Sequence, residues 1–214
     1  MNNSKNIKSK VFADFGNTRA KFLVDDEIIS IYNKDLNYNT LLPILKDRDL
    51  FYGSVNQKTD QIIHDYFSCT NIKTLLDREK SIRFKHISGI GTDRVLSLLG
   101  GSLFFQPPLI TIECGTCNTI NILDDNYKIL GGSIAPGMLT MFDSMEQINP
   151  ALKANLPEHQ KEKGIQIGTN TSDALISGVM ATMIGGIAYY LDMICKDIEN
   201  SGKEIPIILT GGSG

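Results

Sequence analysis

Apolar and polar positions along the first half of the chain follow two periods. Short apolar runs bounded by turn residues predict strands, and apolar residues three and four apart predict helices. The first half thus reads as three strands, then helix, strand, helix and strand, at residues 11–13, 21–24, 27–32, 39–46, 50–53, 56–67 and 72–75. This order predicts a mixed sheet with helices packed on it. A charged loop over 77–90 follows, and then a helix over 91–99 that the glycines at 100 and 101 end.

The second half begins with the same three-strand order. Its expected elements are strands at 109–112, 119–123 and 127–130, a loop over 131–137, a helix over 138–145, an irregular excursion over 149–167, a helix over 171–200 and a strand over 205–209. The repeated order predicts two half-domains of related topology with a ligand-binding cleft between them. We place them at 10–106 and 107–214, after a disordered polar lead-in at 1–9.

The turn between the first two strands has residues that suit phosphate binding. Gly16 and Asn17 favour a tight turn, whose backbone N–H groups can face an anion. Thr18 adds a short donor and Lys21 a positive charge. Asp14, just before the turn, can hold a hydrated Mg²⁺. Taken alone, the stretch fits an ordinary surface hairpin equally well.

Two later strand ends repeat this arrangement. Glu113 ends an apolar run, a turn of Gly115 and Thr116 follows, and the chain returns as the next strand. The strand over 205–209 runs into a Thr-Gly-Gly sequence. Together the three junctions resemble the two phosphate motifs and the adenosine motif of the actin and hexokinase class of ATP-binding folds.

Asp93 and Arg94 lie in the first turn of the helix predicted over 91–99. A first-turn acid such as Asp93 is commonly only a favourable partner of the helix dipole. The neighbouring Arg94 is poorly placed for the dipole, and its guanidinium suits a forked contact with a carboxylate. We interpret Asp93 as a candidate general base and Arg94 as a candidate anchor for an acidic substrate.

Composition and charge limit the kinds of partner and cofactor that we expect for this chain. The 214 residues carry a formal net charge of −3 without a basic block, which argues against nucleic acid as the main partner. No uninterrupted apolar run reaches bilayer length and the polar start has no export signal, so we expect a cytoplasmic protein with no membrane partner. Four cysteines are too few for a disulfide framework. Cys114 and Cys117 lie at a strand turn, and we interpret them as packed there rather than as a redox or zinc pair.

Four stretches, taken in order, make the chain resemble type III pantothenate kinase over nearly its whole length: 14–21, 91–94, 132–137 and 168–171. The resemblance implies an α/β protein of two RNase H-like (actin-like ATPase) half-domains, each a mixed sheet flanked by helices. It implies ATP-dependent phosphorylation of pantothenate to 4′-phosphopantothenate, the first step of coenzyme A biosynthesis. It also implies a homodimer with the acceptor pocket at the subunit interface. The small residues of the helix over 171–200 suit a dimer seam and intrachain packing equally.

The resemblance also assigns individual residues. It implies that Asp93 accepts the proton, that Glu113 binds a monovalent cation such as K⁺ or NH₄⁺, and that Asp14 binds Mg²⁺ through water. The implied substrate-binding residues are Gly91, Thr92, Asp93, Arg94 and Thr171. The implied ATP-binding residues are Asp14, Phe15, Gly16, Asn17, Thr18, Arg19, Ala20, Lys21 and Thr116.

Two positions depart from the family, which typically has Asp where this chain has Glu113 and Asn121. An asparagine supplies no charge, so a non-catalytic regulatory relative is one alternative. The retention of Asp14, Asp93 and Arg94 argues against it. A kinase of the same superfamily acting on another small alcohol or acid is a second alternative, although such a kinase has no need for the sequence at 91–94.

Overall fold

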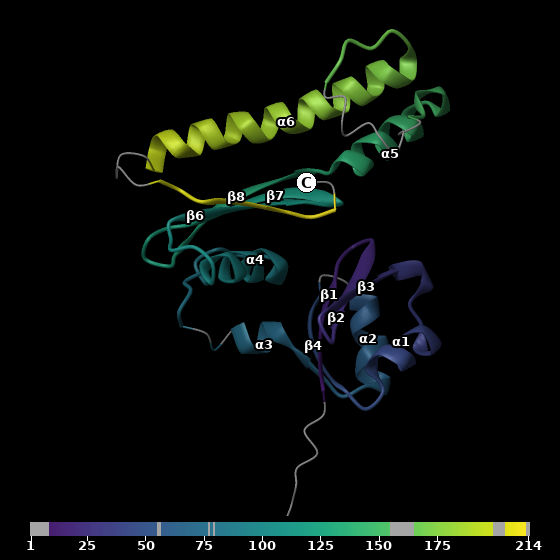
Figure 1. Ribbon diagram of the computed structural model, residues 1–214, viewed down its shortest axis with the longest axis vertical. Coiled ribbons are helices and arrows are strands. Elements are labelled where there is room, and N and C mark those ends of the chain that lie inside the picture. The colour runs from purple at the N-terminus through teal and green to yellow at the C-terminus, as the bar shows by residue number, and fades with distance from the viewer. Residues whose placement is uncertain are drawn as a thin grey trace, which may run out of the picture. The chain divides into compact units, whose positions relative to one another are not determined.

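The computed structural model describes residues 9–54, 57–76, 78, 80–154, 165–198 and 204–212. They belong to two compact units, Met1–Ser97 and Leu98–Gly214, and each is built on one mixed sheet (Figure 1). The division lies inside helix α4 (Thr92–Ser102), whereas the sequence analysis placed it between 106 and 107. The expected disordered lead-in lies outside the described residues, except for Ser9.

The first unit contains a five-stranded sheet in the order β3-β2-β1-β4-β5. Its first three strands form an antiparallel meander, and β4 and β5 are parallel to β1. The elements are β1 (Lys10–Phe15), β2 (Arg19–Val24), β3 (Glu27–Tyr32), the short 3-10 helix η1 (Asn33–Asp35), α1 (Tyr38–Leu45), β4 (Asp49–Ser54), α2 (Gln57–Tyr66), β5 (Cys69–Asn71) and α3 (Ile72–Leu76). Strands β1 to β4 and helices α1 and α2 confirm the elements that the sequence predicts between residues 11 and 67.

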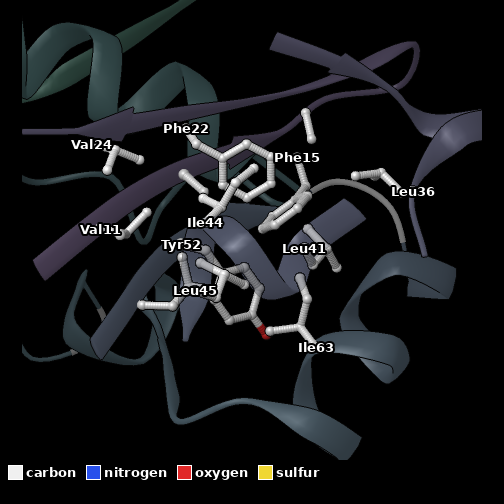
Figure 2. Packing of buried hydrophobic residues seen from close by; sticks show 13 residues of the cluster. Val11, Phe15, Phe22, Val24, Leu36, Leu41, Ile44, Leu45, Tyr52 and Ile63 are labelled. Atoms are coloured by element: carbon white, nitrogen blue, oxygen red, sulfur yellow. The ribbon is translucent and has the colours of Figure 1, made fainter. Parts of the chain in front are cut away.

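One face of this sheet carries the core of the first unit. Strands β1 and β2 alternate between exposed and buried residues, as the pleat of a half-covered sheet requires. Figure 2 shows Phe15 between Phe22 and Tyr52, with ring centroids 5.4 and 5.6 Å apart in edge-on contacts. Leu41 of α1 and Ile63 of α2 cover these rings and are fully buried. The opposite face of β1, which carries Asp14, is left for the site.

The strand predicted over 72–75 is wrong, because those residues form helix α3 and the strand β5 precedes them. Asn71 is the reason. Its side-chain oxygen accepts a hydrogen bond from the N–H of Lys73 at 2.9 Å, and its carbonyl accepts one from the hydroxyl of Thr74 at 2.7 Å. This local bonding starts a helix and overrides the β-propensity of the apolar residues.

The second unit contains a four-stranded sheet in the order β8-β7-β6-β9. Its elements are β6 (Leu109–Cys114), β7 (Cys117–Leu123), β8 (Ile129–Pro136), α5 (Met138–Ile148), the short η2 (Pro150–Leu152), α6 (Thr171–Ile198) and β9 (Ile207–Thr210). The loop predicted over 131–137 is wrong, because β8 continues to Pro136 and pairs with β7. Gly131 and Gly132 have positive φ beside a register shift in that ladder, so these glycines mark an irregularity inside a strand.

Helix α4 continues through Gly100 and Gly101 to Ser102, which corrects the predicted end. A Cβ added at Gly101 would lie 2.7 Å from Cδ1 of Ile208 in β9. The glycine is therefore needed for close helix–sheet packing rather than for a helix stop.

Helix α6 covers one face of the second sheet (Figure 1). Tyr190, Leu191 and Ile194 pack against the buried isoleucines of β6 and β7. By length and composition alone, α6 could also cross a membrane. The sequence analysis found no such run because serine, threonine and glycine interrupt it. Its packing on the sheet gives the helix a role inside the unit.

Candidate active site

Asp14 and Lys21 lie opposite each other in the β1–β2 ladder. Directly opposed residues project from the same face of a sheet, and here that face is the one turned away from the aromatic core. The turn between them is closed by the N–H of Gly16, which donates to the carbonyl of Arg19 at 3.1 Å. Asp14 and Lys21 therefore flank the predicted phosphate turn on one side of the sheet.

Strand β4 brings helix α4 to Asp14. In the parallel β1–β4 ladder, Asp14 pairs with Gly53. A Cβ added at Gly53 would lie 3.4 Å from Leu96 and 3.7 Å from Thr92, so the start of α4 rests on this glycine. Asp93 follows Thr92 directly. The register of β1 and β4 therefore brings Asp93, the predicted general base, close to Asp14, the predicted Mg²⁺ ligand.

The electrostatics of Asp14 agree with this placement. Loss of hydration within the surrounding chain is the largest effect and raises the pKa of Asp14 above its usual range, although part of the residue stays exposed. Lys21 opposes that shift, and the charge of Asp93 adds to it. Two carboxylates that repel each other at one end of a sheet form a place where a cation is favoured.

A glycine shapes the approach to Asp93. A Cβ added at Gly91 would lie 2.3 Å from Oδ1 of Asp93, so the carboxylate folds back against the backbone of Gly91. Thr92 is buried and Arg94 is half-buried in the same turn. The sequence Gly-Thr-Asp-Arg thus folds its carboxylate against its own glycine and carries Asp93 and Arg94 at the start of α4.

The side chains of the turn itself divide into two kinds. Phe15 and Ala20 are fully buried in the core, so only their backbone can contact a nucleotide. Arg19 is exposed, and its guanidinium stacks on the ring of Tyr32 in β3 at 4.0 Å and donates to the Tyr32 hydroxyl. That stack fixes a positive charge at the mouth of the turn.

In the second unit the turn of Gly115 and Thr116 packs against the start of α5. The carbonyl of Thr116 accepts hydrogen bonds from the N–H of Gly137 at 2.9 Å and from the hydroxyl of Thr140 at 2.6 Å. A Cβ added at Gly137 would lie 1.9 Å from the carbonyl oxygen of Gly115. Gly137 is therefore fixed by steric contact with this turn.

The cysteines beside this turn differ in environment. Cys114 is buried, and burial raises the pKa of its thiol. Cys117 is exposed, so only the first of the pair is packed as the sequence analysis expected. Both are free thiols.

Glu113 is held by a buried amide. The Nδ2 group of Asn121, which is fully buried, donates to Oε1 of Glu113 at 3.2 Å and to the hydroxyl of Thr111 at 3.3 Å. Thr119 contributes a further hydroxyl oxygen 3.5 Å from the same nitrogen. The carboxylate of Glu113 and the hydroxyl oxygens of Thr111 and Thr119 gather around one amide nitrogen, and such hard oxygen atoms fit a monovalent cation.

A metal ion at Asp14 would need other ligands. Across the described part of the chain, no three His, Cys, Asp or Glu side chains converge in a way that could hold a metal. Mg²⁺ commonly keeps several waters and binds through one or two carboxylates together with substrate phosphates. Asp14 beside a phosphate turn fits that mode, with Asp93 as its acidic neighbour.

Thr171 is the exposed first residue of α6. Asn170 caps this helix by accepting from the N–H of Asp173 at 3.0 Å. Gly168 lies so close to the helix that an added Cβ would meet the backbone N of Ala174 at 2.2 Å. The structure therefore gives the sequence at 168–171 a capping role, and the substrate role of Thr171 stays a prediction.

The sequence analysis missed Asn33 and Thr140, whose polar groups hold the two turns. Asn33 comes directly after β3, in the position where a meander returns to its first turn. A polar residue at the end of the third strand was the available signal, and strand register alone would have placed it beside residues 16–18.

Similarity to a known protein family extends over most of the chain. Residues 10–193 match the sequence model of the type III pantothenate kinase family. The chain belongs to this family.

Curated relatives agree with that assignment. The type III pantothenate kinase of Finegoldia magna is 28% identical over 126 residues, which cover 58% of this chain and 46% of the relative. That of Flavobacterium johnsoniae is 30% identical over 127 residues, covering 58% and 48%. The aligned part thus spans less than half the length of these pantothenate kinases.

A solved structure supports the fold. A protein described as a Baf family transcriptional activator from Campylobacter jejuni matches with a TM-score of 0.60 and 22% identity, covering 95% of this chain and 84% of that one. At this identity the likeness concerns the fold alone. The α/β architecture of two mixed sheets flanked by helices is the fold that the resemblance implied.

Replacing Asp14 by Asn should raise stability at neutral pH. A carboxyl whose pKa is higher in the folded than in the unfolded chain destabilises the fold wherever the unfolded chain is ionised. We expect a higher Tm for Asp14→Asn than for the native chain at pH 7, with the difference shrinking as the pH falls through the folded pKa toward the unfolded value of 3.8. Thermal unfolding across that range measures it, and a lower Tm for the variant at pH 7 contradicts it.

Replacing Gly137 by Ala should destabilise the second unit. The new methyl group would overlap backbone atoms of Gly115 and Thr116, so we expect a loss of about 2 kcal/mol or more in chemical denaturation. Gly186→Ala in α6 is the matched control. An added Cβ meets nothing within 4 Å there, and helix propensity should stabilise that variant by about 0.5–1 kcal/mol. Equal stability of the two variants contradicts the steric account.

Proposed function

We propose that the chain transfers the γ-phosphoryl group of ATP to the primary hydroxyl of pantothenate. Membership of the type III pantothenate kinase family supports this proposal. The observation that carries it is the placement of Asp93 beside Asp14, with Lys21 opposite Asp14 across the phosphate turn. Since the alignment with curated relatives covers less than half their length, the activity is stated for this chain as a proposal.

The roles follow from the chemistry of the transfer. The backbone of residues 16–18 and the ammonium of Lys21 receive the phosphates, and Thr116 lies on the second turn of the same kind. Asp93 accepts the hydroxyl proton as the oxygen bonds to the γ-phosphorus, and the bond from that phosphorus to the ADP oxygen breaks. Arg94 pairs with the carboxylate of pantothenate, with Gly91, Thr92 and Thr171 around the acceptor.

Two cations complete the proposal. Mg²⁺ at Asp14, bound through water, would neutralise charge on the phosphates. K⁺ or NH₄⁺ would bind Glu113, whose orientation the amide of Asn121 fixes. The reaction draws on the cytoplasmic pools of ATP and pantothenate, so we place the protein in the cytoplasm.

Asn121 also favours a second candidate, a non-catalytic relative that binds nucleotide for regulation. It is a neutral, fully buried donor to the one carboxylate of the second turn. One assay separates the two functions, because a regulator binds MgATP without releasing ADP when pantothenate is added.

Purified protein should release ADP from MgATP only when pantothenate is present, and faster in K⁺ or NH₄⁺ than in Na⁺. Asp93→Asn should lower kcat by about 100-fold or more, because a general base contributes at least that factor. Asp60→Asn, which changes the first-turn acid of α2, is the matched control and should keep the native rate. Pantothenate-independent turnover, or an equal loss in both variants, would refute the role of Asp93.

We further propose a homodimer with α6 at the interface. Tyr189 and Met193 are large apolar residues exposed on α6, at 72% and 45% of their surface. Gly178 and Gly185 on the same helix have open space where a Cβ would lie, so another backbone could approach closely. A second copy of this helix offers the same kind of surface, as a two-fold interface requires.

Charge introduced at that surface should separate the dimer. We expect sedimentation equilibrium to give twice the chain mass for the native protein and the single-chain mass for Tyr189→Arg, with unchanged circular dichroism. A monomeric native protein, or a variant that stays dimeric, contradicts the interface.

A further inference from the structure

A single residue holds all three carbonyl oxygens of the β1–β2 turn. The side-chain Nδ2 of Asn33 donates to the carbonyl of Gly16 at 2.9 Å and to that of Asn17 at 2.8 Å. The backbone N–H of Asn33 donates to the carbonyl of Thr18 at 3.0 Å. Three consecutive peptide units are thus oriented by one residue from outside the turn.

This arrangement has an electrostatic cost. The two carbonyl oxygens can accept only from the N–H side of the amide, which fixes its orientation. The Oδ1 atom of Asn33 is consequently buried and has no hydrogen-bond partner among the described residues. An unsatisfied buried acceptor costs about 1–3 kcal/mol, so folding alone does not account for the placement.

The orientation of the carbonyls determines that of the N–H groups. The peptide bonds of this turn are trans, since the one cis bond among the described residues joins Pro107 and Pro108. In a trans peptide unit the N–H points opposite to the carbonyl. With the carbonyls of Gly16 and Asn17 directed at Asn33, the N–H groups of Asn17 and Thr18 point to the other side of the turn. Successive N–H groups on one side of a turn form an anion-binding concavity.

The second unit uses the same position for the same purpose. Arg19 pairs with Tyr32 and Cys117 pairs with Pro136, so Asn33 and Gly137 each follow the last paired residue of the third strand. The N–H of Gly137 donates to Thr116, and the hydroxyl of Thr140 adds a second hydrogen bond to that carbonyl. In both units the residue that follows the third strand thus donates its backbone N–H to a carbonyl of the turn between the first two strands.

We propose that Asn33 is a positioning residue that presets the β1–β2 turn to receive the phosphates of a nucleoside triphosphate. The inference rests on the proposed function and deepens it, since Asn33 acts through the backbone of residues 16–18 and makes no contact of its own with the ligand. Its backbone N–H corresponds to that of Gly137, and its side chain adds hydrogen bonds to the two carbonyls that precede Thr18.

The test compares two asparagines of the same segment. Asn33→Ala removes both side-chain donors from the turn, while Asn37→Ala removes the cap of α1, which accepts from the N–H groups of Asn39 and Thr40 at 3.0 and 3.2 Å. Calorimetric titration with a non-hydrolysable MgATP analogue measures Kd, and thermal unfolding measures stability. We expect Asn33→Ala to raise Kd by about 10- to 100-fold, as misplacement of a binding group does. Asn37→Ala should lose stability and keep the native Kd.

Asn33→Asp guards against a folding defect in the alanine variant. The carboxylate has nearly the same shape but only accepts hydrogen bonds, so it repels both carbonyls and should weaken nucleotide binding at least as much. Native Kd values in both folded Asn33 variants overturn the inference while leaving the kinase proposal intact. If the native protein does not bind the analogue, both proposals are overturned. Weakened binding in the variants, with no pantothenate-dependent turnover in the native protein, supports Asn33 and refutes the kinase.

Discussion

Strand β1 pairs antiparallel with β2 on one side and parallel with β4 on the other, and the first half of the site depends on this double register. It places Asp14 between Lys21 and Gly53 on one sheet face. A shift by one residue would turn Asp14 into the aromatic core and expose Phe15. The buried contacts of Phe15 with Phe22 and Tyr52 oppose such a shift, so hydrophobic packing on one face sets the position of the charges on the other.

Both units hold carbonyl groups of the turn between their first two strands by hydrogen bonds, but from different donor groups. Each unit begins with a three-stranded meander, and in each the residue after the third strand donates its N–H to a carbonyl of the first turn. In the first unit the side-chain amide of Asn33 holds two further carbonyls, and in the second the hydroxyl of Thr140 adds a hydrogen bond to the carbonyl of Thr116. A fold that needs its turn N–H groups on one side must engage the carbonyls on the other, and these are two chemical ways to do it.

Much of this could be predicted from the sequence where local chemistry and tertiary structure agree. The Gly16–Asn17 turn, the alternation of β1 and β2 and the first-turn acid at Asp93 all gave correct elements, because a tight turn and a buried face leave clear patterns. The failures lie where tertiary contacts override that chemistry. Gly101 reads as a helix stop but is the point where α4 touches β9, and Gly131 reads as a loop but lies within β8.

The site was predictable to the same extent. Asp14, Lys21 and Asp93 lie in motifs, and the structure brings them together. Asn33 and the amide of Asn121 have no motif around them, since their roles depend on the strand register that carries them to the turn or to Glu113. A single polar residue at a strand end acquires meaning only when its neighbour across the sheet is known.

Hydrogen–deuterium exchange with and without a non-hydrolysable MgATP analogue tests the central claim, that these turns are phosphate-binding elements of a kinase. The account predicts slower exchange at the N–H groups of residues 17–19 and 116–117 in the same titration, with the outer strand β3 unchanged. Protection of neither turn, or protection confined to surfaces away from both, would contradict it.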